Sequence, residues 1–333
     1  MTGRMIGEDQ LLGWLRAQAG TSLIGDDAAV LPAEGPFAVT VDSQIAGVHF
    51  THDLDPALLA RRLLAVNLSD LAAMGARPAY AFLALSAARG FDHRKFFRAL
   101  LAACHRAPVR LAGGDLATSP HTVATLTLLG TKPPEGRWLH RSGAAPGHVL
   151  WLGGTVGESA AGGLLIARGA RLHARSIDLP PGLPTALHAT ARRAVRRHLL
   201  PTPQIDLGLW LGRQPEGAAL DVSDGVARDL HRLCRESAAG AVIDAEELPL
   251  ADRFHRLCAA LTIDPLQLAL GGGEDYVLLF ALPPDIVPPA RFACHSIGRI
   301  TRKKQIVLRQ AGAVRPLPPL GWDHLSQQKT PAR

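Results

Sequence analysis

The sequence predicts a mixed α/β protein of two domains. Its 333 residues are more than one domain of usual size contains. Hydrophobic residues make up 47% of the chain and charged residues 20%, which is enough apolar material for a sizeable core. Short β-rich runs alternate with helical stretches along the first half, and the 33 glycines and 25 prolines indicate many loops between them.

The first half contains two strand patterns and two helix patterns. Residues 37–41 and 122–129 alternate apolar residues with polar or β-branched ones, as half-buried strands do. Residues 58–74 and 93–107 carry apolar side chains at helical spacing. We therefore expect strands and helices to alternate in this half.

A change of composition marks the expected domain boundary. Prolines and glycines concentrate between residues 131 and 147, and we divide the chain there into domains 1–137 and 138–333. A strand pattern follows at 148–152 and a helix pattern at 158–168. The second half is therefore expected to be an α/β domain of its own.

Residues 187–199 are predicted to form a basic helix that ends before Pro201. Four arginines make one face of it positive: Arg192, Arg193, Arg196 and Arg197. We favour a solvated or subunit-facing surface for this helix, with a contact to phosphate or nucleic acid as the alternative.

Charge and aromatic content limit the class of partner. Lys and Arg number 36 against 29 Asp and Glu, a formal net charge of +7, and only five of these cations are lysines. A basic surface suits nucleic acid, anionic lipid or phosphorylated small molecules. The aromatic content of 5% argues against a stacking platform for single strands, so we expect no nucleic acid partner.

The cysteines and the apolar runs indicate a cytoplasmic protein. No stretch of about 18 apolar residues occurs, so no membrane span is expected. Residues 1–18 mix charged with apolar residues, unlike a secretory signal peptide. The four cysteines lack the close spacing of zinc or redox motifs, which is typical of reduced thiols: Cys104, Cys234, Cys258 and Cys294.

The sequence lacks the common catalytic motifs and instead contains several acids next to glycines or at the ends of apolar runs. The P-loop, GxGxxG, HExxH and GxSxG patterns do not occur in the sequence. Apolar runs lead into acids at six places: Gly25–Asp27, Asp42, Asp70, Gly113–Asp115, Asp221–Gly225 and Gly271–Asp275. Open α/β sheets place ligands at strand ends, and glycine lets a backbone approach a ligand closely. We therefore expect these acids at strand ends around one shared cleft.

Magnesium is the counter-ion that this pattern favours. Separated aspartates without a histidine or cysteine cluster indicate Mg²⁺ rather than Zn²⁺, because Mg²⁺ prefers carboxylate oxygens and bridges to phosphates. Asp70 and Asp224 each close a run that leads into a helical segment, so both are expected at helix starts, where a carboxylate also caps the helix. The residues alone thus predict metal-dependent binding of a nucleotide or phosphate.

Several runs of the sequence match the motifs of one known family. The specific ones are Ala65–Ala76, with Asn-Leu-Ser-Asp-Leu-Ala-Ala-Met-Gly inside it, and Gly272–Tyr276, which reads Gly-Gly-Glu-Asp-Tyr. Further matches occur in family order: Gly25–Val30, Asp42–Phe50, Gly113–Asp115, Arg141–Gly147, Asp221–Gly225 and Gly321–His324. With these runs the chain resembles the thiamine-monophosphate kinases, and the resemblance covers it from about residue 24 to residue 324.

The resemblance implies the aminoimidazole-ribonucleotide-synthase architecture. Each subunit would have two α/β domains, and the N-terminal domains of two subunits would pair around a dimeric β-barrel. ATP and several Mg²⁺ ions would lie in clefts between the domains and at the subunit interface. The protein would therefore be a homodimer.

The implied reaction is ATP- and Mg²⁺-dependent phosphorylation of thiamine monophosphate to thiamine diphosphate, the last step of thiamine diphosphate biosynthesis. The γ-phosphoryl group would move in line onto a phosphate oxygen that is already ionised, so no general base is expected. Catalysis would depend on positioning and on neutralising two polyanions.

The resemblance also implies which residues form the site. The metal ligands would be Asp27, Thr40, Asp42, Asp70, Asp115, Asp221 and Asp224. The ATP contacts would be Gly114, Arg141 and Ser223. The thiamine site would be lined by His49, Glu274 and Trp322.

Some of these residues have structural alternatives. Trp322 is also compatible with a core position, and His49 with a structural histidine. Asp26 and Asp275 are expected to be helix caps or partners of ligands rather than ligands. Two alternatives to the kinase stay open: a non-catalytic ATP-binding regulator on the same fold, and another ATP-using member of the superfamily.

Overall fold

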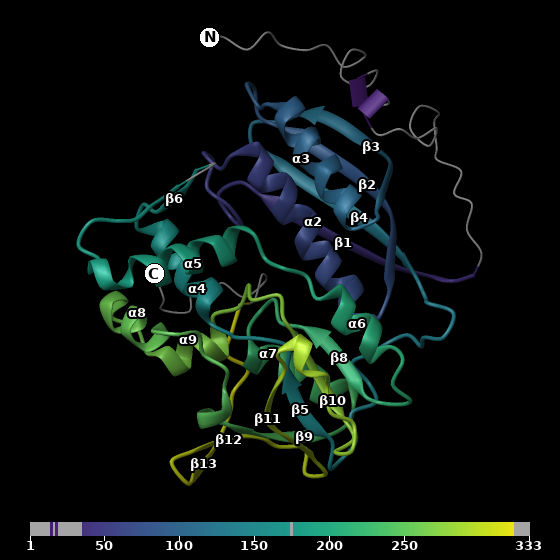
Figure 1. Ribbon diagram of the computed structural model, residues 1–333, viewed down its shortest axis with the longest axis vertical. Coiled ribbons are helices and arrows are strands. Elements are labelled where there is room, and N and C mark those ends of the chain that lie inside the picture. The colour runs from purple at the N-terminus through teal and green to yellow at the C-terminus, as the bar shows by residue number, and fades with distance from the viewer. Residues whose placement is uncertain (1–13, 16, 19–34, 174–175, 323–333) are drawn as a thin grey trace. The chain divides into compact units, whose positions relative to one another are not determined.

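The structure is a computed structural model that describes residues 14–15, 17–18, 35–173 and 176–322 (Figure 1). The predicted α/β class is confirmed, because helices alternate with strands along the chain. None of the helices formed by the described residues is long and apolar enough to cross a bilayer.

The chain folds into two compact units. Unit 1 comprises the chain up to Leu71 together with Ala76–Pro134, and unit 2 comprises Ala72–Gly75 and the chain from Glu135 onward. The expected assignment of 1–137 and 138–333 as two synthase-like domains stays a prediction.

Unit 1 is a four-stranded sheet with helices. Its elements are β1 (Phe37–Ile45), α2 (Pro56–Ala73), β2 (Arg77–Ala87), α3 (His93–Arg106), β3 (Arg110–Thr118) and β4 (Val123–Thr131). The strand order is β1-β4-β2-β3, in which β2 and β3 are parallel and the other neighbours are antiparallel. The two strands and two helices predicted for this half are confirmed as β1, β4, α2 and α3, whereas β2 and β3 were not predicted as strands.

Buried polar side chains fix α2 against β1. The Nε atom of Arg62, a fully buried residue, donates to Gln44 Oε1 at 2.8 Å. Asn67, also buried, donates to the Leu63 carbonyl at 2.8 Å and accepts from the Asp42 backbone N–H at 3.2 Å. Because a buried polar group is costly unless it is hydrogen-bonded, these contacts set the position of α2 along β1.

Unit 2 has a larger sheet. Its helices are α4 (Glu158–Ala167), α5 (His188–Leu199), α6 (Ile205–Leu211), α7 (Val226–Glu236), α8 (Phe254–Leu261), α9 (Pro265–Gly271) and the short η1 (Thr185–Leu187), η2 (Ala245–Glu247) and η3 (Ala290–Phe292). Its strands are β5 (Val149–Leu152), β6 (Arg171–Leu172), β7 (Ile177–Asp178), β8 (Ala218–Asp221), β9 (Gly240–Asp244), β10 (Leu278–Leu282), β11 (His295–Thr301), β12 (Ile306–Gln310) and β13 (Ala313–Pro316). The predicted strand at 148–152 and the helices at 158–168 and 187–199 are confirmed.

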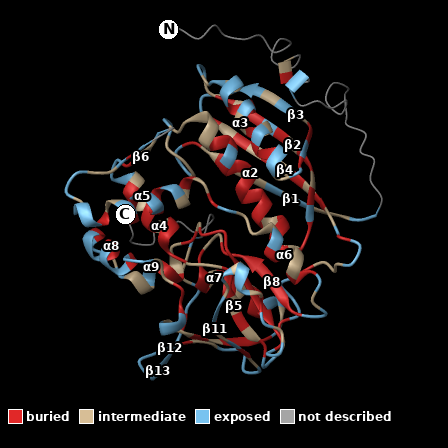
Figure 2. Ribbon diagram, in the orientation of Figure 1, coloured by how far each residue is buried: buried red, intermediate tan, exposed pale blue. Residues whose placement is uncertain are grey.

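The main sheet of unit 2 has the order β13-β12-β9-β11-β5-β10-β8, and β6 pairs with β7 separately. One face carries a large core that includes Leu220 of β8, Leu230 of α7 and Leu279 of β10. The other face packs Phe280 of β10 against Leu207 of α6. The buried residues lie between sheet and helices in each unit (Figure 2). Alternate residues of β10 therefore belong to different cores.

The arginines of α5 contact backbone carbonyls and an acid of unit 2. Arg192 Nε donates to the Ile177 carbonyl at 3.3 Å, and an Arg197 Nη atom donates to the Thr155 carbonyl at 3.0 Å. Arg193 forms a 2.5 Å ion pair with Glu158, whose side chain is only 3% exposed. Three of the four arginines thus have a structural role, which neither interpretation of the basic helix included.

Candidate active site

In unit 1, predicted metal ligands come together where β1 faces α2. Thr40 Oγ1 donates to Asp70 Oδ2 at 2.5 Å, and Asp42 follows two residues along the same strand face. Asp70 lies inside α2 and Asp42 inside β1, so the expectation that they stand at a helix start and a strand end is wrong. The contact between β1 and α2 brings these oxygen ligands together instead.

His49 lies in the turn that follows β1. Its Nδ1 atom accepts from the Ile45 backbone N–H at 3.1 Å, and the His49 N–H donates to the Ile45 carbonyl at 2.9 Å. A neutral imidazole that accepts at Nδ1 carries its proton at Nε2. The Nδ1 side of the ring therefore has a structural contact, and Nε2 carries the ring proton.

Gly114 and Asp115 lie on β3, at the other edge of the sheet from β1. The register across β2 and β4 aligns Asp115 with Ser43, so Asp115 lies on the face opposite to that of Asp42. Three strand spacings, roughly 14 Å, separate the two edge strands. A Cβ atom at Gly114 would be 1.9 Å from the Leu83 carbonyl oxygen, so only glycine fits there. Asp115 therefore cannot share an ion with Asp42 inside one unit 1.

Asp27 lies outside the described residues. The expectation that the acids of both halves surround one cleft stays a prediction.

In unit 2, two loops far apart in sequence are joined by their backbones. The Glu274 N–H donates to the Ser223 carbonyl at 2.7 Å, and the Tyr276 N–H donates to the Val222 carbonyl at 2.8 Å. Asp221, at the end of β8, is 6% exposed. The structure thus brings the predicted residues of the 221–225 and 272–276 loops together.

Trp322 contacts the 221–225 loop. Its backbone N–H donates to the Asp224 carbonyl at 2.9 Å. The preceding Gly321 has φ of +136°, and a Cβ atom there would be 2.2 Å from the Asp224 carbonyl oxygen. Trp322 is 51% exposed, so the alternative of a core tryptophan is wrong and the side chain is accessible for stacking.

An ion-pair network fixes the 221–225 loop. The Asp229 carboxylate accepts from the Asp224 and Gly225 N–H groups, both at 3.1 Å, and Arg232 lies 2.5 Å from Asp224 Oδ2 and 2.6 Å from Asp229 Oδ1. Burial raises the pKa of Asp229 to about 6, against the opposing pull of Arg232. Neither Asp229 nor Arg232 was predicted as a site residue, although an acid in the first turn after Asp-Val-Ser-Asp-Gly is a helix-start signal.

Asp275 is the cap that the sequence predicted. It is 3% exposed, and its carboxylate accepts from the Gly157 N–H at 2.8 Å and the Ser159 N–H at 3.4 Å, at the start of α4. Burial raises the pKa of Asp275 to about 6, and the charge of Arg197 acts against that shift.

The backbones of Arg141 and Ser223 lie far apart in the fold. The Arg141 carbonyl accepts from Ser237 Oγ at 2.8 Å, and Ser237 is the residue at the C-terminal end of α7. Ser223 precedes the N-terminal end of the same helix. Eleven helical residues span about 16 Å. The two predicted ATP contacts therefore lie at opposite ends of α7.

The donor chemistry fits Mg²⁺. Thr40 and Asp70 form an oxygen pair in unit 1, and Asp221 and Asp224 supply carboxylates from one loop in unit 2. Among the described residues, no three His, Cys, Asp or Glu side chains gather closely enough to hold a metal by themselves. Mg²⁺ keeps several waters and binds one or two carboxylates together with substrate phosphates, so such small sets of oxygens suit it.

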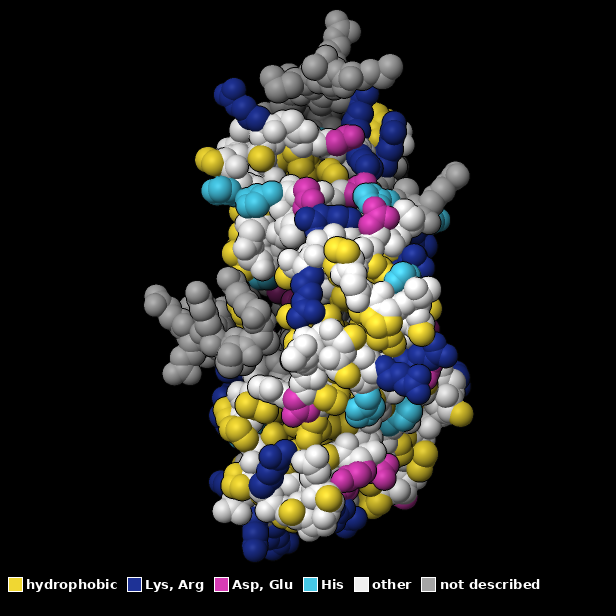
Figure 3. Space-filling model, turned by 90° about the vertical axis from the view of Figure 1, so that its left-hand side faces the viewer, with side chains coloured by type: hydrophobic (Ala, Val, Ile, Leu, Met, Phe, Trp, Pro, Cys, Tyr) yellow, Lys and Arg dark blue, Asp and Glu magenta, His cyan; other side chains and the backbone are white. Residues whose placement is uncertain are grey.

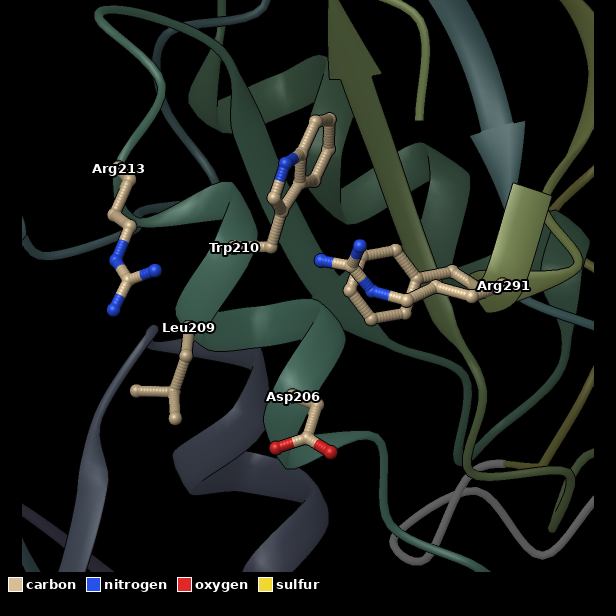
Figure 4. Close-up of a pocket in the computed structure, with 6 residues that line it drawn as sticks. Asp206, Leu209, Trp210, Arg213 and Arg291 are labelled. Atoms are coloured by element: carbon tan, nitrogen blue, oxygen red, sulfur yellow. The ribbon is translucent and has the colours of Figure 1, made fainter. Parts of the chain in front are cut away.

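A separate pocket of unit 2 contains none of the predicted residues (Figure 4). The cavity, of about 370 Å³, lies between α6 and η3 and is lined by Asp206, Leu209, Trp210, Arg213, Arg291 and Phe292. The Trp210 and Phe292 ring centroids are 5.9 Å apart, and the Arg291 guanidinium lies 4.6 Å from the Phe292 centroid. A cation–π contact thus forms part of its wall.

Comparisons with known proteins define the class. Residues 25–131 match the family model of the N-terminal domain of AIR synthase related proteins. The solved structure of AaThiL complexed with AMPPCP and TMP superimposes with a TM-score of 0.75 at 27% identity, covering 97% of this chain and 99% of that chain. The chain thus has the mixed α/β fold of the AIR synthase class.

Closer relatives identify the family. The thiamine-monophosphate kinase of Salmonella typhimurium is 39% identical over 267 residues, which cover 78% of this chain and 76% of that protein. The enzyme of the same name from Synechococcus elongatus is 36% identical over 324 residues, which cover 91% of each chain. The chain belongs to the thiamine-monophosphate kinase family.

Proposed function

We propose that the protein transfers the γ-phosphoryl group of ATP to the phosphate of thiamine monophosphate, giving thiamine diphosphate and ADP. The observation that carries this proposal is the 39% identity to a thiamine-monophosphate kinase, together with the likeness to a structure that holds AMPPCP, an ATP analogue, and TMP. The joining of the 221–225 loop, the 272–276 loop and Trp322 supports it, because these segments carry the residues expected to bind metal and acceptor.

The residues of the chain position the reactants and neutralise their charge. The acceptor phosphate is ionised at neutral pH, so no side chain has to remove a proton from it. Mg²⁺, when bound, would balance the phosphate charges of both substrates. Its ligands would be Asp27, Thr40, Asp42, Asp70, Asp115, Asp221 and Asp224.

Three side chains are proposed to hold the thiamine moiety. Trp322, being exposed, stacks on a heteroaromatic ring, and Glu274 balances its positive charge. His49 donates from Nε2, since its Nδ1 accepts from the Ile45 N–H. Ser223, Gly114 and Arg141 are proposed to contact ATP, with the planar guanidinium of Arg141 suited to two phosphate oxygens.

The unit 1 sheet offers a surface for a homodimer. Its face with Asp115 lies opposite to the face with Asp42, which packs on α2. On the Asp115 face, β1 exposes Val39 and Val41 by 59% and 58%. We propose that this face pairs with the same face of a second copy in a β-barrel, since burying it removes apolar surface from water.

The four cysteines are free thiols, which supports a reducing, cytoplasmic compartment.

A non-catalytic ATP-binding regulator is the second candidate function, in which the basic helix would contact a partner. The contacts of Arg192, Arg193 and Arg197 inside unit 2 weaken that candidate, and on the face shown in Figure 3 the visible Lys and Arg side chains lie among hydrophobic and acidic ones.

An acceptor competition tests the proposal. Purified protein is incubated with ATP, Mg²⁺ and an equimolar mixture of thiamine monophosphate, thiamine and nucleoside monophosphates, and the products are separated by chromatography. We expect thiamine diphosphate as the main product. ADP formation without any phosphorylated acceptor, or phosphorylation of another acceptor in preference, would contradict it.

A further inference from the structure

Unit 2 contains a buried carboxylate that the proposed chemistry does not use. Asp275 stands between Glu274 and Tyr276, and its side chain is almost fully buried. It reaches residues 118 and 116 positions earlier in the sequence, at Gly157 and Ser159. No side chain of α4 itself caps the start of that helix, so Asp275 supplies the acceptors for its free N–H groups.

The residues on either side of Asp275 have disfavoured backbones. Glu274 has φ of +62° and Tyr276 has φ of +50°, in the left-handed region that residues with a Cβ atom rarely adopt. Such conformations persist only where the surroundings fix them. The N–H groups of these two residues bind the 221–225 loop, and the Asp275 carboxylate binds α4. Three consecutive residues are therefore held by two different elements.

A cation completes the anchor. Arg197 of α5 donates to the Thr155 carbonyl, just before α4, and its charge acts on the Asp275 carboxylate. A buried carboxylate with charge-assisted and backbone partners holds its position more firmly than a neutral side chain would. The Tyr276 hydroxyl in turn donates to Glu274 Oε1 at 3.4 Å. Asp275 thus binds the start of α4 within the influence of the Arg197 charge, and its two neighbours contact each other through their side chains.

We propose that Asp275 is a positioning residue that fixes Glu274 and Tyr276 in the orientation that receives the cationic ring of the acceptor. This inference rests on the proposed function for the identity of the acceptor, but not for the anchoring itself. Asp275 does not touch the reactants in this account. Its effect passes through the backbone of its two neighbours.

Asp275→Asn tests the proposal, because asparagine keeps the size but loses the charge and one acceptor. We expect KM for thiamine monophosphate to rise about tenfold, as the loss of a charge-assisted hydrogen bond predicts, while KM for ATP stays within about twofold. The backbone amides of Glu274 and Tyr276 should also exchange their hydrogens faster than in the wild type.

Glu158→Gln is the matched control. Glu158 is a buried carboxylate at the start of the same helix, and it is paired with Arg193. We expect this variant to lower the melting temperature while leaving both the KM for thiamine monophosphate and the exchange of residues 274–276 unchanged. If Asp275→Asn acted only by destabilising α4, Glu158→Gln would show the same changes in KM and in hydrogen exchange, which would contradict the proposal.

Arg197→Gln provides a second route if Asp275→Asn does not fold, because it removes the cation without changing the loop, and the same two shifts are expected at smaller size. Unchanged exchange of residues 274–276 in the folded variants would overturn the proposal, and so would faster exchange with an unchanged KM for the acceptor. If the wild type does not phosphorylate thiamine monophosphate, the proposed function fails, and the exchange measurement still decides the anchoring.

Discussion

Several acids of the candidate site have partners within the protein, and these partners set the conditions for metal binding. Asp70 accepts from Thr40, and Asp224 is paired with Arg232, which also holds Asp229. An ion that binds the Asp224 carboxylate competes with Arg232 for its negative charge. We therefore expect metal binding at this residue to be coupled to a movement of the arginine.

Asp70→Asn should abolish most of the activity and leave the fold intact. Asparagine still accepts the hydrogen bond of Thr40 Oγ1, but it removes the negative charge that would hold Mg²⁺. We expect kcat to fall by about a hundredfold or more, the scale of losing an electrostatic contact to the transition state. Steady-state kinetics and a circular-dichroism melt measure the two quantities.

The control for that variant is Asp55→Asn in the same unit. Asp55 is a partly exposed acid that pairs with Lys95 at 2.6 Å and accepts from the Ala57 N–H at the start of α2. Asparagine is as good a helix cap, so activity and stability should change little. Near wild-type turnover of Asp70→Asn would remove the proposed metal ligand.

At the scale of elements, buried aspartates join loops to helix starts. Asp229 binds the N–H groups of the 221–225 loop from inside α7, and Asp275 binds the start of α4. Each carboxylate satisfies backbone donors that a helix start leaves unpaired. The loops that carry the candidate site are thereby fixed to the more rigid parts of unit 2.

The elevated pKa of Asp229 gives a pH dependence of stability. Its pKa is about 6 in the folded protein against an ordinary 3.8. The folded state therefore binds this proton more tightly, so the contribution to stability is complete below pH 3.8 and is lost as the pH rises through 6. A shift of this size corresponds to roughly 3 kcal/mol.

Asp229→Asn should flatten this dependence. Urea unfolding of the wild type and the variant at several pH values between 4 and 7 gives the free energy of unfolding for each. We expect the free energy of unfolding of the wild type to fall relative to that of Asp229→Asn as the pH rises from 4 to 7. Parallel curves would show that Asp229 has the same pKa in the folded and unfolded states.

Gly321→Ala tests the close approach of the segment before Trp322. A Cβ atom there would be 2.2 Å from the Asp224 carbonyl oxygen, so the segment has to move. We expect a raised KM for thiamine monophosphate and a lower melting temperature. Gly312→Ala is the control, because Gly312 also has positive φ, of +79°, but has nothing within 4 Å of its Cβ position. It should lose about 1 kcal/mol of stability and keep the KM.

At the scale of the whole molecule, we propose a homodimer that pairs through the unit 1 face on which Val39 and Val41 are exposed. Replacing Val39 and Val41 together by lysine should turn a dimer into a monomer in sedimentation velocity and lower the activity. Lysine at Val287, which is 64% exposed in unit 2, should leave the dimer intact. A monomeric wild type at micromolar concentration would contradict the dimer.

The sequence was enough to predict much of the fold and the family but not how the site is held. Periodicity identified β1 and α3, and the apolar residues of α2 also predicted a helix, although α2 is buried on nearly all sides. The sequence of β2 is almost continuously apolar and therefore shows no alternation, although its burial alternates from Ala81 to Ala87. The motif Asn-Leu-Ser-Asp was assigned to a helix start, although its buried Asn67 and Ser69 lie inside α2. The roles of Asp229 and Arg197 depend on contacts between distant segments, which no local pattern contains.

The proposed function requires that the γ-phosphoryl group of ATP ends on thiamine monophosphate. The most direct measurement uses ATP labelled with ³²P at the γ-position and follows the label by thin-layer chromatography. We expect labelled thiamine diphosphate in one-to-one ratio to ADP, only when Mg²⁺ and thiamine monophosphate are both present. Label released as inorganic phosphate, with none in thiamine diphosphate, would contradict it.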